Sequence, residues 1–412
     1  METAFIRNRK LPFELLILSM LNMLKRTIAL ELHSFFNYLK LKFDKPMICI
    51  SSSAFTQSRQ KLSPDIFIGI NDVLIKEFYS DNEQRVKLWE SHRLLSIDGS
   101  TIMLPYSEAL KGVYGVLNNQ KKTDDVIIAR VSVLYDVCND IVLQGTLSPF
   151  KNGEITLAYN HIKEIKHGDL LILDRGYPSF ELAFNIFEKR ADFIFRCKHN
   201  FSNTTKQFIQ SGQNECVLDI SPKQNQSFKD KSIKASSNIT VRLIRIKLDD
   251  GEDELLMTSL TDLTKYPYSI FKDLYYKRWA IETFYNRFKN IISVENFSGL
   301  TQQAILQDFN CALFVSNVQS LIIEEAQEKA DQKGQNRKYD YKINTSISLG
   351  FLKNRIIDLF ISKGAERTLE ELENIIMKHT IPIRTGRKNK RDVDKYRQRT
   401  KPPMFKNRKT II

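Results

Sequence analysis

Residues 169–197 read DLLILDRGYPSFELAFNIFEKRADFIFRC, and this stretch decides the class of fold. The apolar run DLLIL ends at Asp174, a helical pattern follows Pro178 to about Lys189, and a second apolar run, DFIFRC, ends near Cys197. Short apolar runs that alternate with a helix are typical of the strands of an α/β sheet. The stretch therefore predicts a strand, a helix and a further strand of one α/β domain.

More strands precede this stretch. The run RLLSI ends at Asp98, and IIARVSVLYDV and IVLQGTLSP follow as neighbouring strands with Asn139 and Asp140 in the hairpin turn. A helical stretch near residues 154–166 leads into DLLIL. The predicted order is strand, strand, strand, helix, strand, helix, strand. This is the order of a ribonuclease H-like α/β sheet.

The segments around this core differ from it. Residues 11–85 read as helices, with serines at Ser51 to Ser53 and at Ser63 as N-caps. Residues 199–268 are rich in Ser, Asn and Lys and then contain NITVRLIRIKL and ELLMTSL, which predict a strand-rich insertion. The predicted domains are 1–85, helical; 86–199 and 270–330, two parts of the ribonuclease H-like domain; 200–269, the β-rich insertion; 331–380, a small helical segment; and 381–412, a basic tail.

The charge of the chain indicates a polyanionic partner. The 412 residues carry a formal net charge of +14, and from Arg384 onward twelve Lys or Arg and two Asp give 12 − 2 = +10. The preceding chain therefore carries 14 − 10 = +4. Nucleic acid and an anionic membrane surface are both compatible with this balance. The tail has little apolar content and is expected to have no fold of its own.

Several classes of site are excluded by the motifs. The five cysteines are far apart with no CxxC pair, which argues against structural zinc and favours a reducing compartment. The chain has no GxxxxGK[ST], GxGxxG or GxSxG motif, so no nucleotide cofactor is expected. The apolar run near Leu11 to Leu24 is interrupted by Glu14, which favours a buried amphipathic helix over a targeting segment. No stretch has the length of a transmembrane span.

A polar set in the helical N-terminal segment has two interpretations. Around Thr56 the sequence SSSAFTQSRQKL places Gln57, Arg59, Gln60 and Lys61 close together. Contact with DNA is one interpretation, and a solvated helix face is the other.

Two aspartates are predicted at the carboxyl ends of strands. Asp98 lies in SIDGST and Asp174 in LILDRGY, and this edge of an α/β sheet is where sites form. Gly99 and Gly176 follow closely, and glycine lets the backbone turn away and leaves the carboxylate exposed. Ordinary turn chemistry explains either aspartate alone equally well.

Residues 275–289 read YYKRWAIETFYNRFK and predict one helix with a charged face. At roughly 100° per residue, Tyr275, Arg278, Glu282 and Lys289 fall within an arc of about 60°. One carboxylate then shares a face with two cations and a phenol. A surface ion pair between Arg278 and Glu282, four residues apart, is the alternative explanation.

The three carboxylates together are more specific than any one of them. Asp98, Asp174 and Glu282 supply the hard oxygen ligands that a pair of magnesium ions requires. Two such ions about 3.5 to 4 Å apart support in-line phosphoryl displacement. Arg175, Arg278 and Lys289 then make sense as counter-charges or phosphate ligands.

These motifs carry a family resemblance. IDGST, LDRGY and the spacing Tyr-x2-Arg-x3-Glu-x6-Lys, in this order and with a strand-rich stretch before the last, resemble the DDE transposases of the bacterial insertion-sequence-4 family. SSSAFTQSRQKLSP and ENFSG at residues 295–299 are also similar, so the likeness covers about residues 50–320. The resemblance implies that Asp98, Asp174 and Glu282 are the catalytic, metal-binding triad, and that Tyr275, Arg278 and Lys289 contact phosphates and the ends of the transposon DNA.

The resemblance also implies an activity. The implied reaction is cut-and-paste transposition by hydrolysis and strand transfer, with two divalent ions as cofactors (magnesium, with manganese as the alternative). The implied partners are double-stranded DNA, namely the terminal inverted repeats and the target, and a second copy of the chain in a homodimer. The implied location is the cytoplasm, at the nucleoid. Some relatives form a DNA hairpin and hold a flipped base with a tryptophan of the insertion, but here the tryptophans are Trp89 and Trp279, both outside it. A metal-dependent nuclease of the same fold and a catalytically silent DNA-binding descendant are the alternatives.

Overall fold

The computed structural model describes residues 11–45, 48–81, 85–117, 126–222, 228, 230, 232–234, 236–248, 251–334 and 339–383. The chain divides into two compact units. The first unit comprises Met1–Leu74, Ile102–Ile128 and Asn286–Ile412, and the second comprises Ile75–Thr101 and Ala129–Tyr285. The basic tail from Arg384 onward lies outside the described residues.

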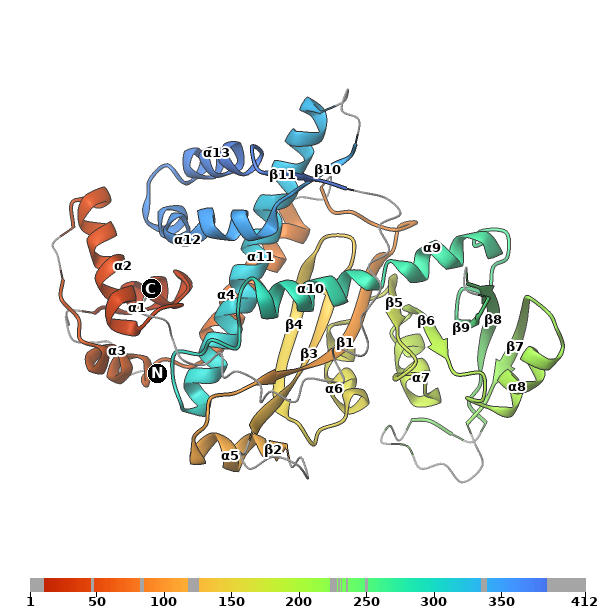
Figure 1. Ribbon diagram of the computed structural model, residues 1–412. Helices are drawn as coiled ribbons and strands as arrows, with labels where there is room; N and C mark the ends of the chain where they lie inside the picture. Colours follow the sequence, from red (N-terminus) through yellow and green to blue (C-terminus); the bar gives the residue numbers. More distant parts are fainter. Residues whose placement is uncertain are drawn as a thin grey trace. The chain divides into compact units, whose positions relative to one another are not determined.

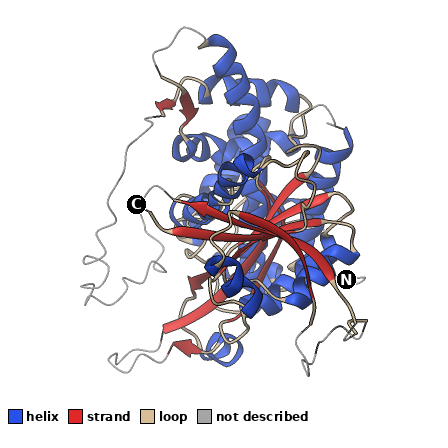
Figure 2. Ribbon diagram, turned by 90° about the vertical axis from the view of Figure 1, so that its right-hand side faces the viewer, coloured by secondary structure: helices blue, strands red, loops and turns tan. Residues whose placement is uncertain are grey.

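A large mixed β-sheet with helices makes up most of the second unit, as Figures 1 and 2 show, and its short strand β2 belongs to the first unit. The strands of the sheet are β1 (Arg93–Met103), β2 (Val116–Leu117), β3 (Val126–Asp136), β4 (Ile141–Pro149), β5 (Asp169–Leu173), β6 (Asp192–Cys197), β7 (Glu215–Ile220), β8 (Ile239–Lys247) and β9 (Asp253–Thr258). In the described chain their order is β2-β3-β1-β5-β6-β9-β8-β7, and β4 pairs with β3. The mixed α/β class predicted from the sequence is therefore confirmed.

The centre of this sheet is parallel. Strand β5 pairs in parallel with β1 on one side and with β6 on the other. A parallel strand covered on both faces is expected to be apolar throughout, and all five residues of β5 are buried. Its side chains Leu171 and Leu173 belong to a core cluster with Ala158 of helix α6 (Glu154–His161) and Leu182 of helix α7 (Phe180–Glu188). Burial on both faces fixes the position of β5 within the sheet.

The predicted helix after Pro178 is confirmed, because α7 begins where the sequence places a cap. Ser179 has an extended backbone, and its side-chain oxygen accepts a hydrogen bond from the Leu182 N–H at 3.1 Å. A serine in this position satisfies one of the free N–H groups of the first turn. The predicted helix near residues 154–166 is shorter than expected, since α6 ends at His161 and a 3-10 helix, η1 (Ile162–Glu164), follows.

Strand β1 does not end at Asp98. The sequence prediction is wrong here, because β1 continues from Arg93 through Asp98 to Met103. Its parallel pairing with β5 ends at Ser96 and Ile172, whereas the strand itself remains extended beside β3. The apolar residues Ile102 and Met103 continue the strand beyond the aspartate, and Ile102 is buried.

The stretch from residue 199 to 268 is part of the same sheet. Helix α8 (Asn203–Gln210) comes first, and β7, β8 and β9 then form an antiparallel set. Strand β9 pairs antiparallel with β6, from Ile194 with Thr258 to Cys197 with Leu255. The strands predicted from NITVRLIRIKL and ELLMTSL are therefore present, and they extend the edge of the sheet that β6 would otherwise form.

The helix predicted across residues 275–289 is two helices. Helix α9 (Phe271–Tyr276) ends before α10 (Trp279–Asn290), and Lys277 and Arg278 form a turn between them. The turn is tightened by hydrogen bonds three residues apart, from the Arg278 N–H to the Tyr275 carbonyl (3.0 Å) and from the Ile281 N–H to the Arg278 carbonyl (3.2 Å). The prediction of one continuous helix was wrong, because its periodicity carries no signal for this local tightening.

The first unit is mainly helical. Its elements include α1 (Phe13–Leu21), α2 (Ile28–Phe43), α3 (Ser52–Arg59), most of α4 (Asp65–Asp81), α5 (Glu108–Tyr114), α11 (Gln302–Lys333), α12 (Thr345–Ile361), α13 (Ala365–Ile376) and the hairpin of β10 (Tyr341–Ile343) and β11 (Thr380–Pro382). The helices predicted for residues 11–85 are present, and Ser51 caps α3 through the Ala54 N–H at 3.1 Å. In the described residues no helix is long and apolar enough to cross a membrane.

Arg59 is a structural residue of the first unit. It is only 3% exposed, and its guanidinium donates to Gln307 Oε1 (2.8 Å), the Ala304 carbonyl (3.1 Å) and Asp308 Oδ1 (2.9 Å). It also donates to the Ser298 hydroxyl, in the ENFSG motif, at 2.5 Å. Arg59 therefore does not belong to a DNA-contacting face. The other members of that polar set (Thr56, Gln57, Gln60 and Lys61) are exposed.

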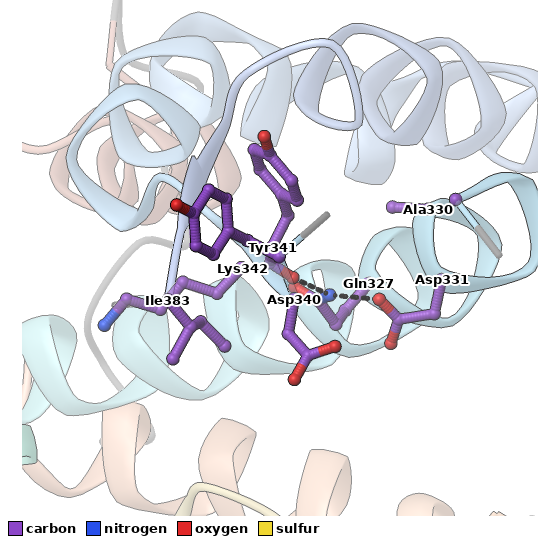
Figure 3. Close-up of a pocket in the computed structure, with 9 residues that line it drawn as sticks. Gln327, Ala330, Asp331, Asp340, Tyr341, Lys342 and Ile383 are labelled. Atoms are coloured by element: carbon purple, nitrogen blue, oxygen red, sulfur yellow. Dashed lines mark hydrogen bonds between the residues drawn. The ribbon is translucent and has the colours of Figure 1, made fainter. Parts of the chain in front are cut away.

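A cavity of about 600 Å³ in the first unit lies between α11 and the β10 hairpin (Figure 3). Gln327 donates to the Tyr341 carbonyl and to Asp331 Oδ1, both at 2.7 Å, and its Oε1 accepts from the Ile343 N–H at 2.8 Å. One glutamine thus fastens the hairpin to the long helix. We interpret the residues that line this cavity as structural, because they connect the hairpin to α11.

We expect Asp169→Ala to destabilise the second unit. Asp169 is buried and accepts both the Nε (2.9 Å) and the Nη2 (2.7 Å) hydrogen bonds of Arg93, its register partner on β1. The alanine variant leaves the guanidinium without its partner, and breaking a largely buried pair costs about 3 to 5 kcal/mol. Urea unfolding monitored by circular dichroism measures the change. Arg367→Ala, which breaks the exposed ion pair with Glu371, is the control and should have little effect.

Candidate acidic site at the sheet edge

Asp98 and Asp174 lie on neighbouring parallel strands at the same edge of the sheet. The register pairs Ser96 with Ile172, and each aspartate follows two residues later in its own strand. Asp174 directly follows the last residue of β5, so it leaves the buried sheet where the strand ends. The Gly99 N–H donates to Asp98 Oδ1 at 2.8 Å and holds that carboxylate beside the strand.

Helix α10 is fixed to β1 at this edge. The Tyr285 hydroxyl donates to the backbone carbonyl of Asp98 at 2.7 Å, and Tyr285 is buried. Phe284, its neighbour, packs against Tyr135 of β3 with ring centroids 5.3 Å apart. Because Glu282 lies on the turn before these residues, the contacts bring its carboxylate to the edge that carries Asp98.

Arg278 lies between two of the three predicted carboxylates. Its Nη2 donates to Glu282 Oε1 at 2.7 Å, and its Nη1 lies 3.9 Å from Asp98 Oδ2. The arginine side chain is only 6% exposed, and its guanidinium carbon lies 5.9 Å from the Tyr275 ring centroid. The structure therefore brings Asp98, Glu282, Arg278 and Tyr275 together.

Asp174 has its own arginine neighbour, which the sequence analysis missed. Arg196 of β6 approaches Asp174 Oδ1 to 3.9 Å, and its Nε forms an ion pair with Glu254 Oε1 of β9 at 2.9 Å. The position of Arg196 near the end of DFIFRC, parallel to the strand before Asp174, was a usable signal. Glu254 gave no such signal, since its place depends on the antiparallel pairing of β6 with β9.

Burial changes the protonation equilibria at this edge. Desolvation raises the pKa of Asp98 to about 6, the Gly99 N–H and Arg278 counteract it, and the charges of Asp174 and Glu154 add to the rise. Desolvation also raises the pKa of Glu254, and Arg196 counteracts this shift. Desolvation and mutual repulsion thus disfavour the charged forms of clustered carboxylates at this partly buried edge, unless a cation is near.

Four buried polar atoms at this edge have no hydrogen-bond partner in the described part of the chain. They are Asp174 Oδ1, the Tyr275 hydroxyl, Arg278 Nε and the hydroxyl of Tyr177, whose pKa is raised by burial and by the charges of Asp98, Glu154 and Asp174. A buried polar atom without a partner costs free energy, and functional sites are where native proteins keep such atoms. The carboxylate oxygen can only accept and the guanidinium N–H can only donate, so the edge could bind both a cation and an anion.

The remaining predicted residues are placed differently. Arg175 is exposed in the loop directly after Asp174. Lys289 is half-buried and lies seven residues beyond Glu282 on α10, in the part of this helix that belongs to the first unit.

The carboxylates do not form a ready-made metal site. Among the described residues, no group of three or more His, Cys, Asp or Glu side chains is arranged to hold a metal ion. Arg278 occupies the position between Asp98 and Glu282 through its two ion pairs. In this structure the negative charge of the carboxylates is partly compensated by the arginines Arg278 and Arg196.

Comparison with known proteins identifies a family and relatives of this chain. The sequence model of the family described as "Transposase DDE domain" matches residues 89–318, which include Asp98, Asp174 and Glu282. The chain is 22% identical over 293 residues to the transposase InsG for insertion sequence element IS4 of Escherichia coli K12, covering 70% of this chain and 64% of InsG. The predicted resemblance to insertion-sequence-4 transposases is thereby confirmed.

A further curated relative is also a transposase. The chain is 20% identical over 314 residues to the transposase for insertion sequence element IS231B of Bacillus thuringiensis subsp. berliner, covering 64% of this chain and 63% of the relative. It spans less than two thirds of the length of InsG and of the IS231B transposase. A cryo-EM structure of a piggyBac transposase synaptic complex with hairpin DNA matches with a TM-score of 0.40 and 12% identity, over 93% of this chain and 79% of that one.

The family match covers more than half of the chain and includes the strands, the helix and the three carboxylates of the acidic edge. The chain belongs to the transposase DDE domain family.

Proposed function

We propose that this chain is a DNA transposase that excises an insertion sequence and joins it to a new site by phosphodiester hydrolysis and strand transfer. The observation that supports this most is the shared guanidinium of Arg278, which lies between Asp98 and Glu282, while the charge of Asp174 helps to raise its pKa. In a transposase of this family, three carboxylates and a phosphate-binding arginine belong in one place. We propose Asp98, Asp174 and Glu282 as the catalytic triad.

We propose a ribonuclease H-like catalytic domain as the framework. The order β4-β3-β1-β5-β6, with β1, β5 and β6 parallel, supports it. Residues 200–269 are proposed as the β-rich insertion, between parts at 86–199 and 270–330. The helical 1–85 and 331–380 segments and the 381–412 tail complete the proposed organisation.

Two divalent metal ions, magnesium or manganese, are the proposed cofactors. The donor set fits hard cations, since the three carboxylates offer only oxygen and Asp174 Oδ1 is buried without a hydrogen-bond partner in the described residues. Asp98, Asp174 and Glu282 would hold the ions once Arg278 releases Glu282. Bound ions would lower the pKa of water and stabilise the leaving oxygen of the displaced phosphodiester.

The protein's own groups would bind and orient the DNA. The Tyr275 hydroxyl and Arg278 Nε–H are buried donors without acceptors in the described residues, and a phosphate oxygen would satisfy both. Arg175 and Lys289 are proposed as further phosphate contacts. Hydrolysis breaks the P–O3′ bond and leaves a 3′-hydroxyl at the end of the element. That hydroxyl then attacks a target phosphodiester and displaces a target 3′-hydroxyl, so the number of phosphodiester bonds is conserved.

The proposed partners are double-stranded DNA, both the terminal inverted repeats and the target, and a second copy of the chain. Two element ends must be held together for coordinated joining, which supports a homodimer in the DNA complex. We propose a cytoplasmic location at the nucleoid, because the proposed substrate is DNA. A nuclease without joining activity and a silent DNA-binding protein are the alternatives that the following experiments exclude or support.

Loss of any one carboxylate should stop the chemistry. We expect Asp98→Asn, Asp174→Asn and Glu282→Gln to lower cleavage by about a hundredfold or more, because each removes a metal-binding charge while keeping its shape. DNA binding should persist, since phosphate contacts supply most of the affinity. The measurement is magnesium-dependent cleavage and joining on a labelled duplex that carries the terminal repeats flanking this gene. Glu164→Gln, an exposed carboxylate on η1, is the matched control.

The outcomes of this experiment separate the alternatives. Joined product from the wild type, and none from Glu282→Gln, supports the transposase. Cleavage without joining by the wild type supports the nuclease. Tight binding with neither reaction supports the silent descendant, and joining by Glu282→Gln contradicts the assignment of the triad.

Arg278→Ala should weaken engagement of the DNA end. The substitution removes a charge-assisted phosphate contact of about 1.5 to 3 kcal/mol. Competition binding with terminal-repeat and unrelated duplexes measures the loss, and Lys163→Ala, an exposed cation on η1, controls for net charge. Wild-type binding and cleavage by Arg278→Ala would remove the proposed phosphate role.

Truncation after Ile383 should weaken binding to all DNA sequences equally. The missing segment carries a net charge of 12 − 2 = +10, and neutralised phosphates release counterions. The slope of log K against log salt concentration should therefore become shallower, as measured by fluorescence anisotropy. An unchanged slope would show that the tail does not contact DNA.

A further inference from the structure

Glu154, the first residue of α6, lies against the backbone that follows both aspartates. A Cβ atom built on Gly99 would be 2.7 Å from Glu154 Cγ and 3.0 Å from its Cδ and Oε1. A Cβ atom built on Gly176 would be 3.9 Å from Glu154 Oε2. One glutamate side chain therefore touches the residue after Asp98 and reaches the loop after Asp174.

The contact gives a reason for glycine at position 99 that differs from the sequence-based one. Gly99 lies inside β1 and has no positive φ, so its backbone does not require glycine. The reason is space, because a larger side chain would meet the middle of the Glu154 side chain, which would then have to shift. The prediction that Gly99 lets the backbone turn away from the strand is wrong.

Glu154 is itself held in place. It forms an ion pair with Arg130 of β3, whose guanidinium carbon lies 4.9 Å from the Phe150 ring centroid. The Arg130 side chain is 16% exposed, whereas that of Glu154 is 40% exposed. The carboxylate also lies in the first turn of α6, where the helix dipole favours negative charge. Its position is thus fixed from the strand and from the helix.

We propose that Glu154 is a positioning residue for the reaction, which sets the spacing and direction of the carboxylates of Asp98 and Asp174. This inference rests on the proposed function. The hydrogen-bonded pairing of β1 with β5 ends at Ser96 and Ile172, before either aspartate. Beyond that point the Glu154 side chain fills the space beside Gly99 and Gly176.

Glu154 would act on the Asp98 carboxylate through one hydrogen bond. The Gly99 N–H donates to Asp98 Oδ1 at 2.8 Å, so the peptide against which Glu154 packs also holds the Asp98 carboxylate. Removing the side chain frees this peptide to move. A shift of about 1 Å in a reacting group can cost about a hundredfold in rate.

Two substitutions test the shape and the charge of Glu154 separately. We expect Glu154→Ala to lower the rate of cleavage at saturating DNA by about tenfold to a hundredfold and to weaken Mn²⁺ affinity measured without DNA by a similar factor. The KM for the duplex should stay unchanged, because no DNA contact is removed. Glu154→Gln should retain most of the rate and affinity, since it fills the same space and its amide oxygen still accepts from Arg130.

A double-mutant cycle with Gly99→Ala tests the contact itself. Gly99→Ala should impair the wild type, because the new methyl group displaces Glu154, but it should have little further effect in Glu154→Ala. Such non-additivity is expected only for groups in contact. Thermal unfolding of every variant shows whether the loss arises from the site or from the fold, and Glu164→Ala is the control for loss of a nearby exposed carboxylate.

Three results would overturn the inference: Glu154→Ala with wild-type rate and Mn²⁺ affinity, Glu154→Gln as impaired as Glu154→Ala, or additive effects of Gly99→Ala and Glu154→Ala. Asp98→Asn in the same assay distinguishes the two proposals. If Asp98→Asn still cleaves, the proposed function fails. When Asp98→Asn is inactive and Glu154→Ala behaves as wild type, only the positioning role fails.

Discussion

The parallel register of β1 and β5 is the constraint on which the acidic edge depends. Pairing of Ser96 with Ile172 puts Asp98 and Asp174 level with one another at the point where the hydrogen-bonded pairing stops. The strands before them are buried on both faces, so neither aspartate can move along its strand without exposing core. Two negative charges are therefore held next to each other at a partly buried edge of the sheet, and the surrounding residues have to compensate for them.

The compensation follows one pattern three times. Arg278 pairs with Glu282, Arg196 with Glu254, and Arg130 with Glu154. Two of these arginines also approach an aspartate of the edge to 3.9 Å, Arg278 toward Asp98 and Arg196 toward Asp174. Each arginine thus has a glutamate as its close partner, and the aspartates keep weaker contacts. A cation or phosphate at this edge would have to compete with the ion pairs that are already formed.

The features of the site that depend on the local sequence pattern could be predicted from the sequence. Three of these features depend only on neighbouring residues: the end of the strand near Asp174, the cap at Ser179 and the four-residue spacing of Arg278 and Glu282. The parts that were missed depend on pairing between distant segments. Glu254 reaches Arg196 only because β9 pairs with β6, and Glu154 reaches Gly99 only because α6 returns to the strand edge. The break between α9 and α10 was missed because a tightened turn preserves the apolar spacing.

The strands of residues 200–269 contribute to the site as well as to the sheet. Strand β9 continues the sheet from β6, so the residue just beyond their paired ends, Glu254, lies beside the edge that carries Asp174. Its side chain is 10% exposed, and burial of a carboxylate is tolerated when an arginine is paired with it. Arg196, held in this way, keeps its second contact toward Asp174. A segment that interrupts the α/β alternation in sequence is therefore continuous with the acidic edge in structure, and a change in how β9 pairs would alter the charge balance at Asp174.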